Sequence, residues 1–153
     1  MKAAKIIATF FGAGYMPVAP GTFGTIAGLL ISYILSICIS DVIIFYSILL
    51  LLIVGAYTLG IYACRRLEIE WGHDPSKIVI DEALGFWISI LFLPININVM
   101  LAAFVLFRFF DIIKPFGIRK IDLLKTHHSV MLDDVVAGVY SNIIIQAVVY
   151  FYK

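Results

Sequence analysis

The feature that most constrains this chain is the stretch from residue 42 to residue 64, which contains no charged side chain. About 20 consecutive apolar residues let a helix cross the roughly 30 Å hydrocarbon core of a bilayer. The whole chain of 153 residues is 63% hydrophobic and 14% charged, whereas a soluble domain is about 45–50% apolar and about 25% charged. Such an excess cannot all be buried in one small core. It excludes an ordinary cytosolic enzyme and predicts an integral membrane protein.

The apolar residues fall into segments that are separated by short polar stretches. We expect four to five hydrophobic helices that form a single all-α, membrane-embedded domain over residues 1–153. The third and fourth segments are slightly short for a full span, so we expect their charged ends to reach water. The segments cover residues 23–39, 42–64, 78–93, 99–114 and 135–151.

The distribution of basic residues orients these segments, because cytoplasmic loops of membrane proteins carry an excess of Lys and Arg. Basic residues precede the first segment and follow the second and the fourth, whereas the turns at 38–41 and 94–98 have none. The N-terminal segment, the 65–82 loop and the 108–134 loop are therefore predicted to face the cytoplasm. The net charge of only +1 argues against a nucleic-acid partner, which would require a basic stripe.

Acidic residues stand at the predicted cytoplasmic ends of these segments, where ionisable groups usually mark a site or an ion path. They are Asp81, Glu82, Asp111, Asp133 and Asp134. Asp81 and Asp111 are equally distant in sequence from Asn96, so two helical arms of a hairpin would bring both carboxylates to one depth. A cluster of carboxylates repels itself unless a hard cation is present, and oxygen ligands suit Mg²⁺ or Mn²⁺. We therefore expect a metal site near one cytoplasmic cleft.

Simpler interpretations of the same residues stay open at this point. Arg108 and Asp111 are i,i+3 neighbours and would also form an ion pair at the level of the lipid headgroups. Asp133 and Asp134 precede the last apolar segment, where a carboxylate would cap a helix and favour its N-terminus electrostatically.

Two prolines and spaced glycines directly before the first long segment predict a rigid turn. Its backbone N–H groups at and after Gly21, with the side chains of Thr22 and Thr25, would form an anion pocket suited to phosphate. A plain loop with a threonine cap is an equal alternative. Lys77 and Lys114 would add positive charge for the same phosphate.

The histidines and cysteines carry no recognisable site pattern. His73, His127 and His128 lack the spacing of metal ligands, so we expect them in solvated loops. Cys38 and Cys64 lie in or beside apolar runs without a CxxC motif, which indicates packing residues rather than a disulfide or a zinc site.

Taken in order, these motifs resemble the phosphatidylglycerophosphatase A family of bacteria. The resemblance covers nearly the whole chain, and its matching stretches are residues 12–25, 78–85, 107–115 and 131–138. Two stretches of the 108–134 loop depart from the family pattern. Residues 126–130 replace a more glycine-rich run with a histidine, and residues 115–117 replace a commoner proline–tryptophan–proline turn.

The resemblance implies a Mg²⁺-dependent phosphatase of the bacterial cytoplasmic membrane that faces the cytoplasm. It would hydrolyse phosphatidylglycerophosphate to phosphatidylglycerol and phosphate within phospholipid biosynthesis. The implied metal ligands are Asp81, Glu82, Asp133 and Asp134, and the implied catalytic residues are Asp81, Asp111 and Asp134, with Asp111 a ligand or base. The implied phosphate-binding residues are Gly21, Thr22, Thr25, Arg108 and Lys114. Both attack by water and an aspartyl-phosphate intermediate agree with this set.

Other functions fit the sequence less well. The chain has no Asp-Gly-x-x-Ala-Arg run, which a phosphatidyltransferase would need. A small ion carrier that uses intramembrane carboxylates would place its acids at mid-bilayer, whereas here they stand near segment ends. A phosphatase for another lipid phosphate remains an alternative substrate assignment.

Overall fold

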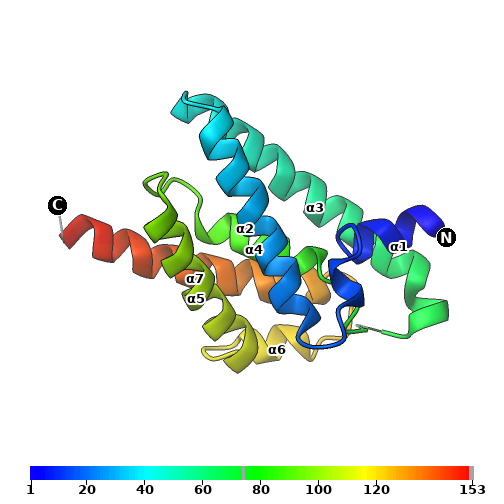
Figure 1. Cartoon of the computed structure of the whole chain (residues 1–153). Coiled ribbons are helices and arrows are strands. Elements are labelled where there is room, and N and C mark those ends of the chain that lie inside the picture. The colour runs from blue at the N-terminus through cyan, green and yellow to red at the C-terminus, as the bar shows by residue number, and fades with distance from the viewer. Residues whose placement is uncertain (74, 152–153) are drawn as a thin grey trace.

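The structure is a computed structural model that describes residues 1–73 and 75–151 (Figure 1). Within these residues all regular elements are helices, and there is no strand. Its elements are α1 (Lys2–Ala8), the 3₁₀ turn η1 (Ala13–Tyr15), α2 (Pro20–Cys38), α3 (Val42–Trp71), α4 (Ile80–Ser89), α5 (Ile97–Ile113), α6 (Ile118–Asp122) and α7 (Ser129–Phe151). The predicted all-α fold is therefore confirmed.

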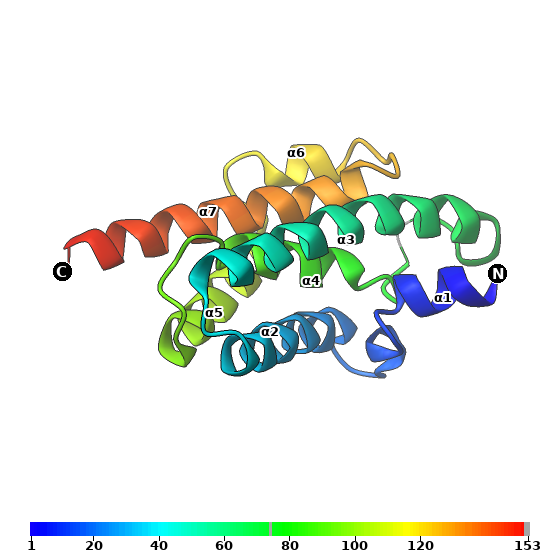
Figure 2. The ribbon, with the colours of Figure 1, turned by 90° about the horizontal axis from the view of Figure 1, so that it is seen from above.

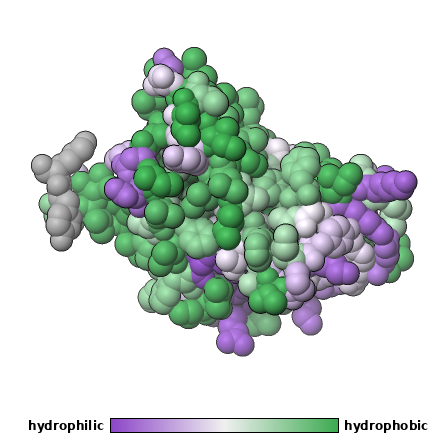
Figure 3. All heavy atoms as spheres, viewed as in Figure 1, coloured by the Kyte–Doolittle hydropathy of each residue, from purple (hydrophilic) through white to green (hydrophobic). Residues whose placement is uncertain are grey.

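Three helices, α2, α3 and α7, are long and apolar enough to cross a membrane. The remaining two hydrophobic helices are α5, with 17 residues, and α4, with 10. Hydrophobic residues cover the surface over α2 and α3, and hydrophilic residues gather toward the end where α1 lies and along the lower edge (Figure 3). This separation is what a helical protein that sits in a bilayer requires.

The predicted segment 78–93 differs most from the helix that it contains. Only Ile80–Ser89 is helical, and eight of these ten residues are buried. Figure 2 shows α4 in the middle of the bundle, with α7 and α3 on one side and α2 on the other. A helix that is buried on nearly every side is a core helix, and α4 is too short to span a bilayer.

Side-chain hydrogen bonds satisfy backbone groups at the start of α3 and at the end of α4. The Asp41 side chain accepts hydrogen bonds from the backbone N–H groups of Ile43 and Ile44 at 2.8 and 3.0 Å and so caps α3. At the C-terminal end of α4, the side-chain amide of Asn142 from α7 donates to three backbone carbonyls. The shortest of these hydrogen bonds is 2.8 Å, to Leu91. Carbonyls at a helix end have no partner within the helix, and Asn142 satisfies them where water is scarce.

Small residues allow α2 and α7 to pack closely on α4. A Cβ atom on Gly138 of α7 would lie 2.3 Å from the carbonyl oxygen of Gly85, and one on Gly28 of α2 would lie 3.2 Å from the Cα atom of Ala83. The indole N–H of Trp87 also donates to the carbonyl of Gly28 at 3.0 Å. Small residues at helix interfaces are the usual route to close packing in membranes.

The contact between α4 and α7 predicts a large difference between two glycine substitutions. Gly138→Ala should destabilise the fold by about 1–3 kcal/mol, because its methyl group would overpack a backbone contact. Gly55→Ala in α3 is the matched control, since a Cβ there meets no described atom within 4 Å. Thermal denaturation of both variants in one detergent measures the difference, and equal midpoints would contradict the packing.

Candidate active site

A cleft of about 260 Å³ opens where α4 begins, and acidic side chains from three helices line it. Asp81 and Glu82 stand in the first turn of α4, Asp111 near the end of α5, and Asp133 and Asp134 within α7. The predicted convergence of these acids in one cleft therefore agrees with the structure. Asp81 and Asp111 line the same cleft, but α4 packs chiefly on α7 and α2 rather than pairing with α5 as a simple hairpin.

The closest group of carboxylates consists of Asp81, Glu82 and Asp134. One oxygen atom from each lies within 4.8 Å of the others. Asp81 and Asp134 are only 6% and 3% exposed, and Oε2 of Glu82 is buried without a hydrogen-bond partner among the described residues. Three converging carboxylates, one of which has an unsatisfied oxygen, fit a hard divalent cation such as Mg²⁺.

The charge state of Glu82 reflects this crowding. Burial, together with the negative charges of Asp134 and Asp111, raises the pKa of Glu82 to about 8. Near neutral pH the cleft thus favours a proton or a cation beside this carboxylate.

Asp133 has a different environment from its neighbour Asp134. Its Oδ2 atom lies 2.6 Å from Nζ of Lys114, which also contacts Asp122 at 3.1 Å. Partial burial lowers the pKa of Lys114, but the contacts with Asp133 and Asp122 raise it more, so the net shift is upward. The structure thus places Lys114 as the charge partner of Asp133, although its side chain still lines the cleft.

The start of α7 corrects the interpretation of the paired aspartates as helix caps. The helix begins at Ser129, before both aspartates. Thr126 and Ser129 form the cap, because each side-chain oxygen accepts a hydrogen bond from the backbone N–H of the other residue, at 3.0 and 2.9 Å. Asp133 and Asp134 therefore lie inside the helix, where both are buried.

Arg108 and Gly21 meet Glu82 on one side of the cleft. Arg108 donates from Nη1 to Oδ2 of Asp111, so the expected i,i+3 pair forms, but with side chains only 15% and 13% exposed. The Nε atom of Arg108 is buried without a described partner. A Cβ on Gly21 would lie 2.1 Å from Oε1 of Glu82 and 3.2 Å from Nη1 of Arg108. A side chain at this position would therefore displace the Glu82 carboxylate or the Arg108 guanidinium.

Other groups of the predicted anion pocket are engaged within α2 or lie outside the cleft. The buried Thr25 hydroxyl donates to the carbonyl of Gly21 at 2.9 Å, and the backbone N–H of Thr22 donates to the carbonyl of Ala19 at 2.9 Å. Lys77 lies outside the cleft, with its Nζ atom 5.7 Å from the ring centre of Trp71. The pocket thus reduces to the close approach of Gly21 beside Arg108.

Several cleft residues carried no signal in the sequence. Pro75, Ser76, Ile78 and Val130 line the cleft with the acids, and only their nearness to Asp81 and Asp133 in the chain could have indicated them. The histidines stand outside the cleft. His127 and His73 contact Glu68 at 2.8 and 3.4 Å, and His128 contacts the Tyr57 hydroxyl at 3.1 Å.

Comparison with known proteins gives one consistent family. The family described as Phosphatidylglycerophosphatase A matches residues 6–149. The chain is 42% identical to a Bacteroides thetaiotaomicron protein provisionally named a phosphatidylinositol-3-phosphatase, over 92% of the chain and 89% of that protein. It is 39% identical to Phosphatidylglycerophosphatase A of Haemophilus influenzae, over 95% and 88% of the two chains, and 36% identical to that of Escherichia coli, over 89% and 77%. No solved structure gives a significant match. Because the family match and these relatives cover almost the whole chain, the protein belongs to the phosphatidylglycerophosphatase A family of phosphatases.

Proposed function

We propose that this protein hydrolyses the terminal phosphate of phosphatidylglycerophosphate in a Mg²⁺-dependent reaction that yields phosphatidylglycerol for phospholipid biosynthesis. The observation that carries the proposal is the group of three carboxylate oxygens within 4.8 Å of one another, next to the guanidinium of Arg108. Two relatives are named for this activity. A phosphomonoester dianion needs positive charge and a positioned nucleophile, and the cleft has residues suited to both needs.

Asp81, Glu82 and Asp134 would hold the metal. A divalent cation held by these residues would supply Lewis-acid chemistry to the phosphate and to an attacking water. The unsatisfied Oε2 of Glu82 supports this assignment, because a buried carboxylate oxygen without a partner costs free energy unless a ligand satisfies it. Asp133 also has a buried oxygen without a described partner, Oδ1, but its Oδ2 is paired with Lys114, so its claim to the metal is weaker.

Arg108 would bind the phosphate. Its planar guanidinium matches two phosphate oxygens at once, and its buried Nε has no described partner. Asp111 holds Nη1 of the same group, close to the position that a Cβ on Gly21 would occupy. Asp111 also lines the cleft, where its carboxylate is placed to act as a ligand or a base.

The position of the cleft suits a lipid substrate. The acids stand where α4 begins and α5 ends, at the ends of apolar helices, so that a headgroup would react while its acyl chains stay in the bilayer. The basic residues of the connecting segments support a cytoplasmic position for this side by the positive-inside rule. We therefore propose that the protein lies in the bacterial cytoplasmic membrane with its active site toward the cytoplasm.

A second substrate has a specific observation in its favour. The relative with 42% identity is named for phosphatidylinositol 3-phosphate. That lipid carries the same chemical group, a phosphomonoester at the membrane surface, on a different headgroup. The two substrates must therefore be tested side by side.

Purified protein should release phosphate from phosphatidylglycerophosphate in Mg²⁺, and EDTA should abolish the release until excess Mg²⁺ restores it. The reason is that the converging carboxylates of the cleft need a cation to coexist. Phosphate release is measured in micelles, in parallel with phosphatidylinositol 3-phosphate. Full turnover in EDTA would contradict the metal, and release from the inositol lipid alone would contradict the proposed substrate.

The paired aspartates of α7 should respond differently to loss of charge. Asp134→Asn should lower kcat by more than the roughly 10–100-fold that loss of an outer-shell partner costs, and excess Mg²⁺ should partly rescue it. Asp133→Asn should keep measurable kcat but lower the thermal midpoint, because Lys114 loses a buried charged partner. Both variants are compared by Mg²⁺ titration of phosphate release and by thermal melts. A dead Asp133→Asn beside an active Asp134→Asn would reverse the assignment.

A further inference from the structure

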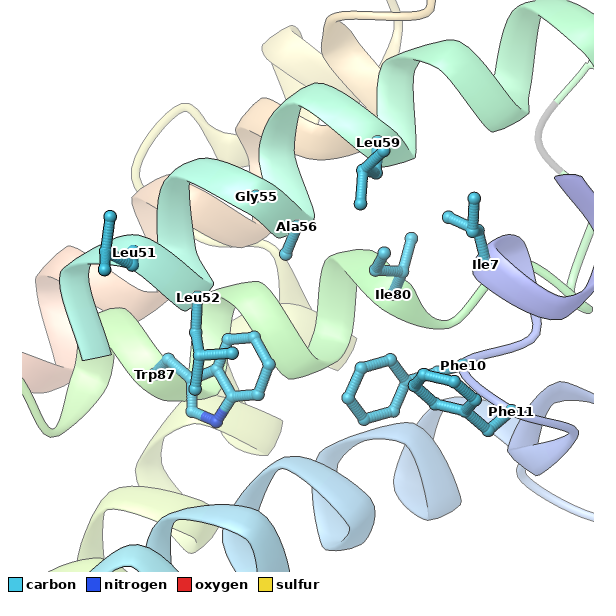
Figure 4. A pocket seen from close by; sticks show the side chains of 10 residues that line it. All are labelled: Ile7, Phe10, Phe11, Leu51, Leu52, Gly55, Ala56, Leu59, Ile80 and Trp87. Carbon is cyan, nitrogen blue, oxygen red and sulfur yellow. The ribbon is translucent and has the colours of Figure 1, made fainter. Parts of the chain in front are cut away.

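A second cavity, unrelated to the acidic cleft, lies between α1, α3 and α4. It has a volume of about 210 Å³. Figure 4 shows Ile80 and Trp87 entering it from α4, Leu52 and Leu59 from α3, and Ile7 and Phe10 from the α1 side. Ile80 and Trp87 are two helical turns apart, so the cavity follows α4 for about 10 Å at 1.5 Å per residue.

The chemistry of the lining excludes a polar ligand. The described side chains that line the cavity are aliphatic or aromatic. The one polar atom among them, Nε1 of Trp87, already donates to the carbonyl of Gly28 at 3.0 Å. A bound water needs two to four polar partners, and this lining offers none. Only an apolar group can fill the cavity without leaving a polar group unsatisfied.

The cavity opens on the surface of a helix that is suited to lie in lipid. Leu51 and Leu59 of α3 border it and are 72% and 48% exposed, and Phe11 on the α1 side is 81% exposed. Because α3 is long and apolar enough to cross a bilayer, this opening is continuous with the lipid-facing surface of the protein. The neighbouring molecules there are phospholipids, whose acyl chains match the lining in polarity.

The packing of α2 on α4 separates this cavity from the acidic cleft. A Cβ on Gly24 of α2 would lie 2.6 Å from the carbonyl oxygen of Val79, and one on Gly28 would lie 3.2 Å from the Cα of Ala83. These contacts leave no room for a chain to pass between α2 and the start of α4. An acyl chain in the cavity is thus separated from the acidic cleft along the α2–α4 contact.

We propose that the cavity between α1, α3 and α4 binds one acyl chain of a bilayer phospholipid that is not the substrate. The bound chain fills the space between the N-terminal helix and the core helix α4. It adds dispersion contacts that an empty apolar cavity lacks.

Trp87 is a built-in probe of this site, because it lines the cavity and is only 2% exposed. The chain has two tryptophans, so Trp71→Phe leaves Trp87 alone. The full-length variant is reconstituted in phosphatidylcholine vesicles with ordinary or brominated acyl chains, since bromine quenches indole fluorescence at short range. We expect the brominated chains to quench Trp87.

Gly55→Leu supplies the decisive comparison, because Gly55 lines the cavity and a Cβ there meets no described atom within 4 Å. The added side chain should fill the cavity and abolish the quenching. Val54→Leu, at a 59% exposed neighbour outside the cavity, is the matched control and should keep it. A second measurement uses detergent-purified proteins that keep Trp71. Native mass spectrometry should show a retained phospholipid in the parent protein and in Val54→Leu, but not in Gly55→Leu.

Equal fluorescence in the two kinds of vesicle would overturn the proposal, as would quenching that Gly55→Leu leaves unchanged. Quenching that appears only when the protein is diluted in excess lipid would assign the cavity to a second copy of the chain and would also overturn it. Phosphate release by Gly55→Leu should stay at the parent level. Its loss would contradict the separation of the two cavities.

Discussion

The convergence of carboxylates at the start of α4 is the constraint on which the rest of this structure depends. Asp81, Glu82 and Asp134 bring oxygens within 4.8 Å of one another in a setting where water is largely excluded. Such charges repel strongly at low dielectric, so the fold must hold them together by packing. The close contact of Gly138 with Gly85 joins α7 to α4 and keeps Asp134 beside the pair from α4.

Two basic residues form three ion pairs with the acids around that group. Lys114 contacts Asp133 and Asp122, and Arg108 contacts Asp111. Each pair neutralises an acid that lies close to the metal-binding group but outside it. Among the described residues, this leaves two buried carboxylate oxygens without a hydrogen-bond partner, Oε2 of Glu82 and Oδ1 of Asp133, and one such guanidinium nitrogen, Nε of Arg108. These are the groups that a cation and a phosphate would satisfy.

Much of this arrangement could be predicted from the sequence. Hydropathy predicted an all-helical membrane protein, and the acids of the cleft were identified because charges beside apolar helices are costly. The length of α4 could not be predicted, because residues 78–93 read as one apolar run whether they span lipid or are buried by other helices. The separate environments of Asp133 and Asp134 depend on Lys114, which reaches the pair only through the fold. The sequence makes Thr25 a plausible phosphate ligand, but in the structure its hydroxyl donates to the Gly21 carbonyl. The sequence does not reveal this local hydrogen bond.

The central claim is that the three-carboxylate group, rather than the Asp133–Lys114 pair, holds the divalent cation. Anomalous X-ray scattering from crystals grown with Mn²⁺ in place of Mg²⁺ tests it most directly. The account predicts a peak about 2.0–2.2 Å from carboxylate oxygens of Asp81, Glu82 and Asp134, at the distance usual for a small hard cation. A peak ligated by Asp133 and Asp122 with Lys114 displaced, or an empty group at saturating Mn²⁺, would contradict it.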